Sequence, residues 1–190
     1  MKRVLVVIAL LGLVACGNDD DGSADTTTTT EAASATSTTG TPTSTTLAAF
    51  GNTPVSRPDT SPPSVLTDVR LGSHEGFERV VFQFGKLDVV PGYKVEHASG
   101  PFTQDASGAD VAVSGGGHIA VRLSAAAHNE AGQTTYVGPK RIPGRGSVTE
   151  VVMLGDFEGV VSWVIGTTAD RPFRVFSLQN PARVVIDIST

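Results

Sequence analysis

Apolar and polar residues alternate in short runs along the last two thirds of the chain, from Ser64 to Thr190. The segments 79–84 and 118–123 carry a large apolar residue at every second position, which predicts strands with one buried face. Trp163 alternates with apolar neighbours in the same way and is expected in the core. Runs rich in valine, isoleucine and aromatic residues predict further strands at 65–71, 93–97, 151–154, 160–165, 173–178 and 183–188.

Glycine and proline interrupt these runs, and no long window keeps the apolar spacing of a helix. One helical turn at 125–128 is the most that the pattern allows. Short strands at this spacing, in a stretch long enough for one compact domain, favour a β-sandwich or a small open barrel. We therefore predict a single all-β domain over residues 64–190.

Residues 1–15 have a different character. Two basic residues precede an apolar run that ends at Ala15, which is typical of a secretory signal and too short to cross a bilayer as a helix. The sequence Leu13-Val14-Ala15-Cys16 resembles the lipobox of bacterial lipoproteins. This resemblance implies that Cys16 carries diacylglycerol and palmitate and anchors the protein on the extracytoplasmic side of the cell membrane. The alternative is an ordinary signal peptide whose cleavage site precedes a cysteine.

Residues 16–63 are dominated by serine and threonine after the cysteine, with a pure threonine run at 26–30. Such a composition buries too little apolar surface to offset its chain entropy, so we predict a disordered linker. A flexible chain of this length spans roughly 35 to 40 Å on average, which would let the domain sample the wall next to the membrane. A glycosylated stalk is compatible with the same composition.

The net charge of −5 resides mainly in the linker, because 13 acidic and 11 basic residues follow from Ser64 onward. A nearly neutral domain gives no electrostatic reason to expect nucleic-acid binding. Cys16 is the only cysteine, so the chain forms no intramolecular disulfide. We expect a monomer.

The last two predicted strands carry a more specific pattern. The strand at 173–178, the turn Pro181-Ala182-Arg183 and the following Val-Val-Ile-Asp-Ile resemble the ending of AMIN domains, and 77–82 resembles their opening hairpin. With the lipobox and the threonine-rich linker, the chain is similar to the AMIN-like lipoproteins of actinobacteria. The resemblance implies a β-sandwich that binds peptidoglycan and is not catalytic, with residues 100–146 as an elaboration of the basic fold.

No residue pattern indicates a catalytic centre, a metal site or a cofactor site. Asp156 and Glu158 are a close acidic pair, but the glycines on either side predict the tip of a hairpin. We therefore assign no catalytic residue, no metal ligand and no cofactor. The histidines lack the spacing of zinc-binding motifs, and their positions are His74, His97, His118 and His128.

A polar loop at 128–145 contains the best candidates for ligand contact, Tyr136, Lys140 and Arg141. A planar aromatic ring can stack on a sugar, and cations can meet the carboxylates of wall peptides. The same composition also fits a surface loop without a function.

Arg183 and Asp187 lie four positions apart on the last predicted strand and therefore share one of its faces. Ion contacts to neighbouring strands are the favoured interpretation of this pair. Arg183 is also a candidate contact for an acidic peptide, because a guanidinium binds a carboxylate in a fork.

Three functional hypotheses follow. The first is a non-catalytic envelope module that binds peptidoglycan or a wall-associated protein. The second is an accessory subunit that docks on an envelope protein complex through a sheet edge, and the third is an envelope hydrolase with an unrecognised site. The sequence does not separate the first two.

Overall fold

The computed structural model describes residues 47–59, 64–85 and 89–190, which form strands and turns without a helix. Cys16 and the predicted signal segment lie outside the described residues. Within the described part, no helix could span a membrane. The strands are β1 (Val55–Arg57), β2 (Ser64–His74), β3 (Phe77–Gly85), β4 (Tyr93–His97), β5 (Phe102–Thr103), β6 (Asp110–Val111), β7 (Gly117–Leu123), β8 (Ala125–Ala126), β9 (Arg141–Arg145), β10 (Val148–Phe157), β11 (Val160–Thr167), β12 (Phe173–Leu178) and β13 (Arg183–Ser189).

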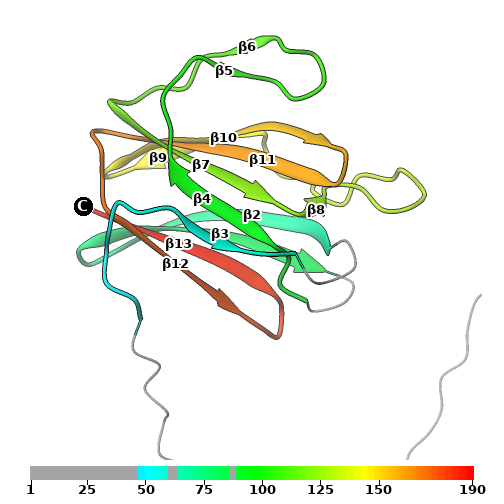
Figure 1. Cartoon of the computed structure of the whole chain (residues 1–190), viewed down its shortest axis with the longest axis horizontal. Coiled ribbons are helices and arrows are strands. Elements are labelled where there is room, and N and C mark those ends of the chain that lie inside the picture. Colours follow the sequence, from blue (N-terminus) through cyan, green and yellow to red (C-terminus); the bar gives the residue numbers. More distant parts are fainter. Residues whose placement is uncertain (1–46, 60–63, 86–88) are drawn as a thin grey trace, which may run out of the picture. The chain divides into compact units, whose positions relative to one another are not determined.

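Two sheets pack face to face, so the domain is a β-sandwich (Figure 1). The first sheet has the strand order β1-β4-β7-β11-β10-β9, and the second sheet has the order β12-β13-β3-β2-β8. Neighbouring strands are antiparallel except β2 and β8, which pair in parallel. The all-β fold class predicted from the alternating pattern is confirmed, with the sandwich rather than the open barrel.

The alternating residues fill the space between the sheets. β3 turns Val80, Phe82 and Phe84 inward, each at most 1% exposed. The ring of Trp163 on β11 meets the ring of Phe82 edge-on, with the centroids 5.8 Å apart, so the expected position of this tryptophan in the core is confirmed. Each such side chain contributes roughly 1.5 to 3 kcal/mol on burial, which explains why these positions specify the register of both sheets.

The folded part begins before Ser64, so the predicted linker is wrong at its C-terminal end. β1 is the edge strand of the first sheet and pairs with β4, with Val55 opposite Val95. Gly51 exchanges two backbone hydrogen bonds with Phe173, of 2.9 and 3.0 Å, and so ties this segment to the second sheet. Backbone pairing at a sheet edge needs no hydrophobic run, and the short polar sequence of β1 therefore gave no strand signal.

The segment 125–128, where the pattern allowed at most one helical turn, contains no helix. Ala125 and Ala126 form β8, which pairs with the start of β2 and brings the chain from the first sheet to the second. The small side chain of Ala125 is fully buried there. Residues paired in a strand have an extended backbone, so Ala125 and Ala126 are not part of a helical turn.

A small hairpin of β5 and β6 lies over the outer face of the first sheet, above β10 and β11 in Figure 1. The backbone amide of Asp105 donates to the carbonyl of Leu154 at 3.2 Å and fastens the hairpin to β10. Phe102 packs edge-on against His118 of β7, with the ring centroids 5.0 Å apart. Within residues 100–146, this hairpin alone forms a third layer, whereas β7 and β9 belong to the first sheet and β8 belongs to the second.

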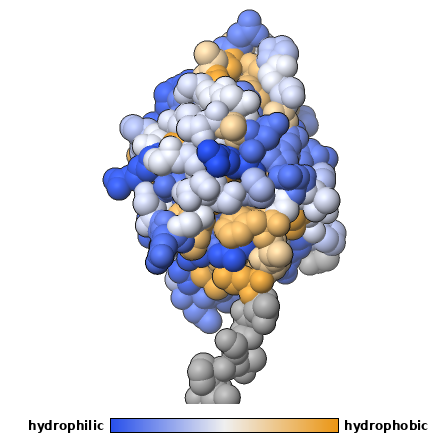
Figure 2. Space-filling view, turned by 90° about the vertical axis from the view of Figure 1, so that its left-hand side faces the viewer, coloured by the Kyte–Doolittle hydropathy of each residue, from blue (hydrophilic) through white to orange (hydrophobic). Residues whose placement is uncertain are grey.

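The outer face of the second sheet carries aromatic rings and guanidinium groups side by side. The Cζ atom of Arg174 lies 4.5 Å from the centroid of the Phe50 ring, and that of Arg79 lies 5.1 Å from the Phe77 ring. Figure 2 shows hydrophobic and strongly hydrophilic residues next to each other in its lower part, on the side of this sheet. The contacts of Phe50 give the segment before β1 a second attachment to the domain.

Candidate functional site

β10 extends beyond its neighbour β9, because the two strands pair only from Val148 to Val152. Along the extension lie two adjoining cavities of about 310 and 160 Å³, which share Lys140, Met153 and Asp156. We call the two together the edge depression. Its other lining residues come from the β8–β9 loop, the β5–β6 loop and β10, and they are Ala127, His128, Gly132, Thr134, Tyr136, Gln104, Leu154 and Gly155.

Asp156 and His128 form the main polar contact of the edge depression. One carboxylate oxygen of Asp156 lies 2.6 Å from Nδ1 of His128 and accepts a 2.9 Å hydrogen bond from the backbone amide of Ala127. The other oxygen, Oδ1, is buried without a hydrogen-bond partner among the described residues. Because Oδ1 is shielded from solvent, a ligand in the cavity does not reach this oxygen.

The hairpin tip that the sequence predicts around Asp156 and Glu158 is confirmed only in part. Glu158 and Gly159 form the turn, with φ angles of 50° and 75°, the left-handed values that suit a tight hairpin. Asp156 instead belongs to β10 and binds the β8–β9 loop. It is therefore a structural and lining residue rather than a solvated turn residue.

Tyr136 does not present its ring to solvent. The residue is 5% exposed, and its ring meets Trp163 edge-on at 5.5 Å between centroids. Its hydroxyl donates a 2.8 Å hydrogen bond to the carbonyl oxygen of Pro139. Burial, with a smaller contribution from the charge of Asp68, raises the pKa of the Tyr136 hydroxyl to about 12. Because neither face of the Tyr136 ring is exposed, the ring cannot stack on a sugar as the sequence led us to expect.

Lys140 is exposed and lines both cavities of the edge depression. Its backbone carbonyl accepts a 2.8 Å hydrogen bond from the amide of Met153, which fixes the end of the loop against β10. The flexible ammonium group is therefore attached to a rigid backbone position beside the cavity. Of the three predicted loop residues, Lys140 alone combines exposure with a place in the depression.

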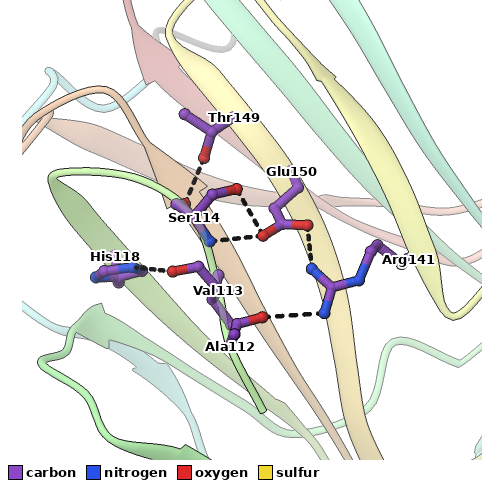
Figure 3. Close-up of polar contacts among 7 residues, drawn as sticks. All are labelled: Ala112, Val113, Ser114, His118, Arg141, Thr149 and Glu150. Atoms are coloured by element: carbon purple, nitrogen blue, oxygen red, sulfur yellow. Dashed lines mark hydrogen bonds and ion pairs between the residues drawn. The ribbon is translucent and has the colours of Figure 1, made fainter.

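Arg141 has a structural role (Figure 3). Its guanidinium forms an ion pair with Glu150 of β10 and donates a 3.0 Å hydrogen bond to the carbonyl of Ala112. Glu150 also accepts hydrogen bonds from the backbone amide and the hydroxyl of Ser114, at 2.6 and 2.7 Å. The network fastens the segment after β6 to the outer face of the first sheet.

The same network sets the ionisation of Glu150. Burial opposes its charge, but the two hydrogen bonds from Ser114 and the contact with Arg141 outweigh burial and hold the pKa of this carboxyl below its usual value. Glu150 therefore stays charged at neutral pH and keeps its bond to Arg141.

Arg183 lies on β13 of the second sheet, away from the strands that form the edge depression. Its Nε donates a 3.1 Å hydrogen bond to the carbonyl of Pro181. Asp187 on the same strand is fully buried and binds the guanidinium groups of Arg79 and Arg174. The favoured interpretation of Asp187 as a partner of neighbouring strands is confirmed, whereas Arg183 meets none of the predicted loop residues.

Sequence reasoning missed His128 and Asp156 as site residues. They are 28 positions apart, and only the pairing of β10 with its neighbours brings them together. Elsewhere in the described ranges, no three histidine, cysteine, aspartate or glutamate residues gather closely enough to hold a metal ion.

Comparison with known proteins supplies one match. The AMIN-like domain family matches residues 64–190, which is the whole sandwich except β1. Searches of curated proteins and of solved structures found no match.

Proposed function

Because the chain belongs to the AMIN-like domain family, we propose that it is a membrane-anchored envelope protein whose domain binds peptidoglycan without chemical turnover. Membership of this family suggests a non-catalytic, peptidoglycan-related binding module. The family match over residues 64–190 is the observation that carries the proposal. The lipobox resemblance of Leu13 to Cys16 supports the anchor.

The edge depression is the wall-binding surface in this proposal. Its larger cavity of about 310 Å³ lies at the small end of the range of ligand sites, which suits one sugar or a short peptide segment. The Lys140 ammonium can bind a stem-peptide carboxylate, and the imidazole of His128, 49% exposed at the same cavity, can form a hydrogen bond with a sugar hydroxyl. The depression thus contains both kinds of group that a muropeptide requires.

Titration of the full chain with soluble muropeptides tests this surface. The double variant His128→Ala/Lys140→Gln should bind about tenfold more weakly, because losing one charge-assisted hydrogen bond costs roughly 1.4 kcal/mol or more. Arg183→Gln on the second sheet is the matched control and should bind like the wild type. Circular dichroism of each variant checks that the fold is intact.

The possible results test the location of the binding surface and the wall-binding function separately. If Arg183→Gln loses binding and the double variant keeps it, the contact surface lies on the second sheet. If the wild type binds neither muropeptides nor intact sacculi in a saturable way, the wall-binding proposal fails.

The anchor has its own test at Cys16. Cys16→Ser, or inhibition of the lipoprotein signal peptidase with globomycin, should leave the protein unprocessed or mislocalised. A Cys16→Ser protein that still sediments with membranes after a high-salt wash would contradict lipid anchoring.

A protein partner is the second candidate function, because two large apolar side chains next to the edge depression are exposed. Val137 is 87% exposed and Phe157 is 47% exposed. Exposed apolar residues beside a polar cavity are common in protein interfaces. A photo-crosslinker at position 157 in living cells should capture a specific protein if this function is correct, and only background adducts if it is not.

A further inference from the structure

The second sheet ends at β12, which pairs along its whole length with β13 on one side (Figure 1). On the other side, the bridge between Gly51 and Phe173 is the one backbone contact that the described residues make with β12. We infer that the rest of this edge pairs with β12 of a second copy of the chain, so that two sandwiches share one continuous sheet.

The Gly51 bridge shows which backbone groups of β12 point away from β13. The amide and the carbonyl of Phe173 both bond to Gly51, at 2.9 and 3.0 Å. Successive residues of an antiparallel strand direct these groups to opposite sides, so the groups of Val175 and Ser177 also face the free edge. Two N–H donors and two carbonyl acceptors on this side of β12 therefore have no backbone partner among the described residues.

The sequence of β12 does not protect this edge from pairing. Natural edge strands are often very short or carry proline, lysine or a bulge. The other edge strands of the two sheets follow this rule, because β1 has three residues, β8 has two and β9 contains Pro143. β12 has six residues without proline or lysine, and its pairing with β13 has no bulge. Its single charged side chain, Arg174, is bonded to Asp187 and only 17% exposed.

One two-fold register lets β12 pair with itself and uses all four open groups of each strand. Val175 then lies opposite Ser177 of the second copy, and Ser177 lies opposite its Val175, which forms four backbone hydrogen bonds. A shift by one pair toward either end would bring an open residue opposite Phe173, which is already bonded to Gly51, or opposite Gln179, which lies in the turn after β12. The Gly51 bridge and the turn thus select the register.

The side chains are compatible with this register. Val175 belongs to the core, so its neighbours Phe176 and Leu178 lie on the outer face of the sheet. Phe176 meets Phe176 of the second copy directly across the strands, where an aromatic pair stabilises a sheet. Leu178, which is 39% exposed, lies opposite Arg174 of the second copy, so no like charges face each other. The pairing covers an exposed apolar side chain without opposing charges.

The proposed membrane anchor makes a second copy the partner that is available to this edge. Two short strands bury less surface than a typical stable interface, so the separate domains should associate only weakly. A flexible chain of the length between Cys16 and Leu47 spans roughly 30 Å on average, so domains anchored on one membrane can meet at high effective concentration. The inference rests on the proposed anchor for this concentration, and it does not depend on wall binding.

This dimer departs from the monomer that the sequence led us to expect. The alternation of apolar residues in a strand shows its buried face, but it does not show whether the strand lies at the edge of a sheet.

Disulfide formation in oxidised membranes that contain the full chain tests the register. Phe176→Cys should form a linked dimer, because the Cα atoms of such a directly opposed pair lie about 4.5 Å apart, within the range of a disulfide. Leu178→Cys is the matched control on the same face of β12, since the two copies of this position lie roughly 14 Å apart in the proposed register. Phe176→Cys should give at least about tenfold more dimer than Leu178→Cys. The wild type, whose only cysteine is Cys16, should give none.

Adding Ser177→Pro to Phe176→Cys tests the backbone pairing. The N–H group of Ser177 faces the free edge, so proline removes two of the four hydrogen bonds between the copies and none of those to β13. The amount of linked dimer should fall about tenfold, because the proline ring also obstructs the approach of the second strand. Circular dichroism of the purified variants checks that the fold is intact.

The inference is overturned if Phe176→Cys gives no dimer or if Leu178→Cys gives as much. Undiminished dimer from a folded Ser177→Pro variant overturns it as well, and so does a disulfide to a different protein, because the edge then has another occupant. If the Ser177→Pro variant does not fold, the comparison of Phe176→Cys with Leu178→Cys decides alone. The Cys16→Ser experiment tests the anchor separately, and muropeptide titration bears only on the edge depression.

Discussion

Asp187 shows how a single residue organises the outer face of the second sheet. It is fully buried, accepts two hydrogen bonds from Arg79 at 2.6 and 2.9 Å, and accepts a third from Arg174 at 2.9 Å. Asp187→Asn leaves both guanidinium groups without a counter-charge and should cost about 3 to 5 kcal/mol of unfolding free energy. Urea denaturation measures the loss, with Asp110→Asn on the exposed hairpin as the control. Equal midpoints for the two variants would show that the arginines find other partners.

The contribution of Glu150 to the stability of the fold should depend on pH. Its pKa is lower in the folded protein than in the unfolded chain, so its bonds stabilise the fold above the unfolded value, near 4.5, and are lost as the pH falls through the folded value. At pH 7 Glu150→Gln should therefore be less stable by roughly 1 to 3 kcal/mol. The difference from the wild type should shrink progressively below pH 4.5.

Urea denaturation between pH 3 and pH 7 checks this dependence on Glu150. Glu158→Gln at the exposed hairpin turn is the control and should parallel the wild type. A constant difference between Glu150→Gln and the wild type at every pH would show that the carboxyl is not held in its charged form by Ser114 and Arg141.

At the scale of elements, β1 belongs to the sandwich although it precedes the region that matches the family. A chain that starts at Ser64 loses the pairing of β1 with β4, the Gly51 bridge and the contact of Phe50 with Arg174. We expect it to unfold at least about 2 kcal/mol more easily than a chain that starts at Leu47. Denaturant unfolding of the two chains measures the difference, and equal stability would show that β1 is dispensable.

At the scale of the whole molecule, limited proteolysis locates the boundary between linker and domain. The serine- and threonine-rich stretch before Leu47 should be cut first, because it lacks the apolar residues needed for a core. Mass spectrometry should then identify a resistant fragment that begins near Leu47. A fragment that begins near Ser64 would place the boundary where the family match starts and contradict the role of β1.

The sequence by itself determined the fold class and most of the strands. Alternation in β3 and β7 predicted which residues are buried, because a strand with one buried face must repeat every two residues. The apolar surroundings of Trp163 likewise predicted its place in the core. These features depend on the local periodicity of apolar residues, which is visible in the amino-acid sequence itself.

Tertiary structure alone decided the sites. It buried Tyr136 against Trp163, joined His128 to Asp156 and placed β12 at the edge of the second sheet. It also added β1, whose backbone pairs with β4 without any hydrophobic signal. In each case, the order and register of strands that are distant in the chain decide which residues meet. Local periodicity shows which face of a strand is buried, but it does not show which residue of another strand lies beside it.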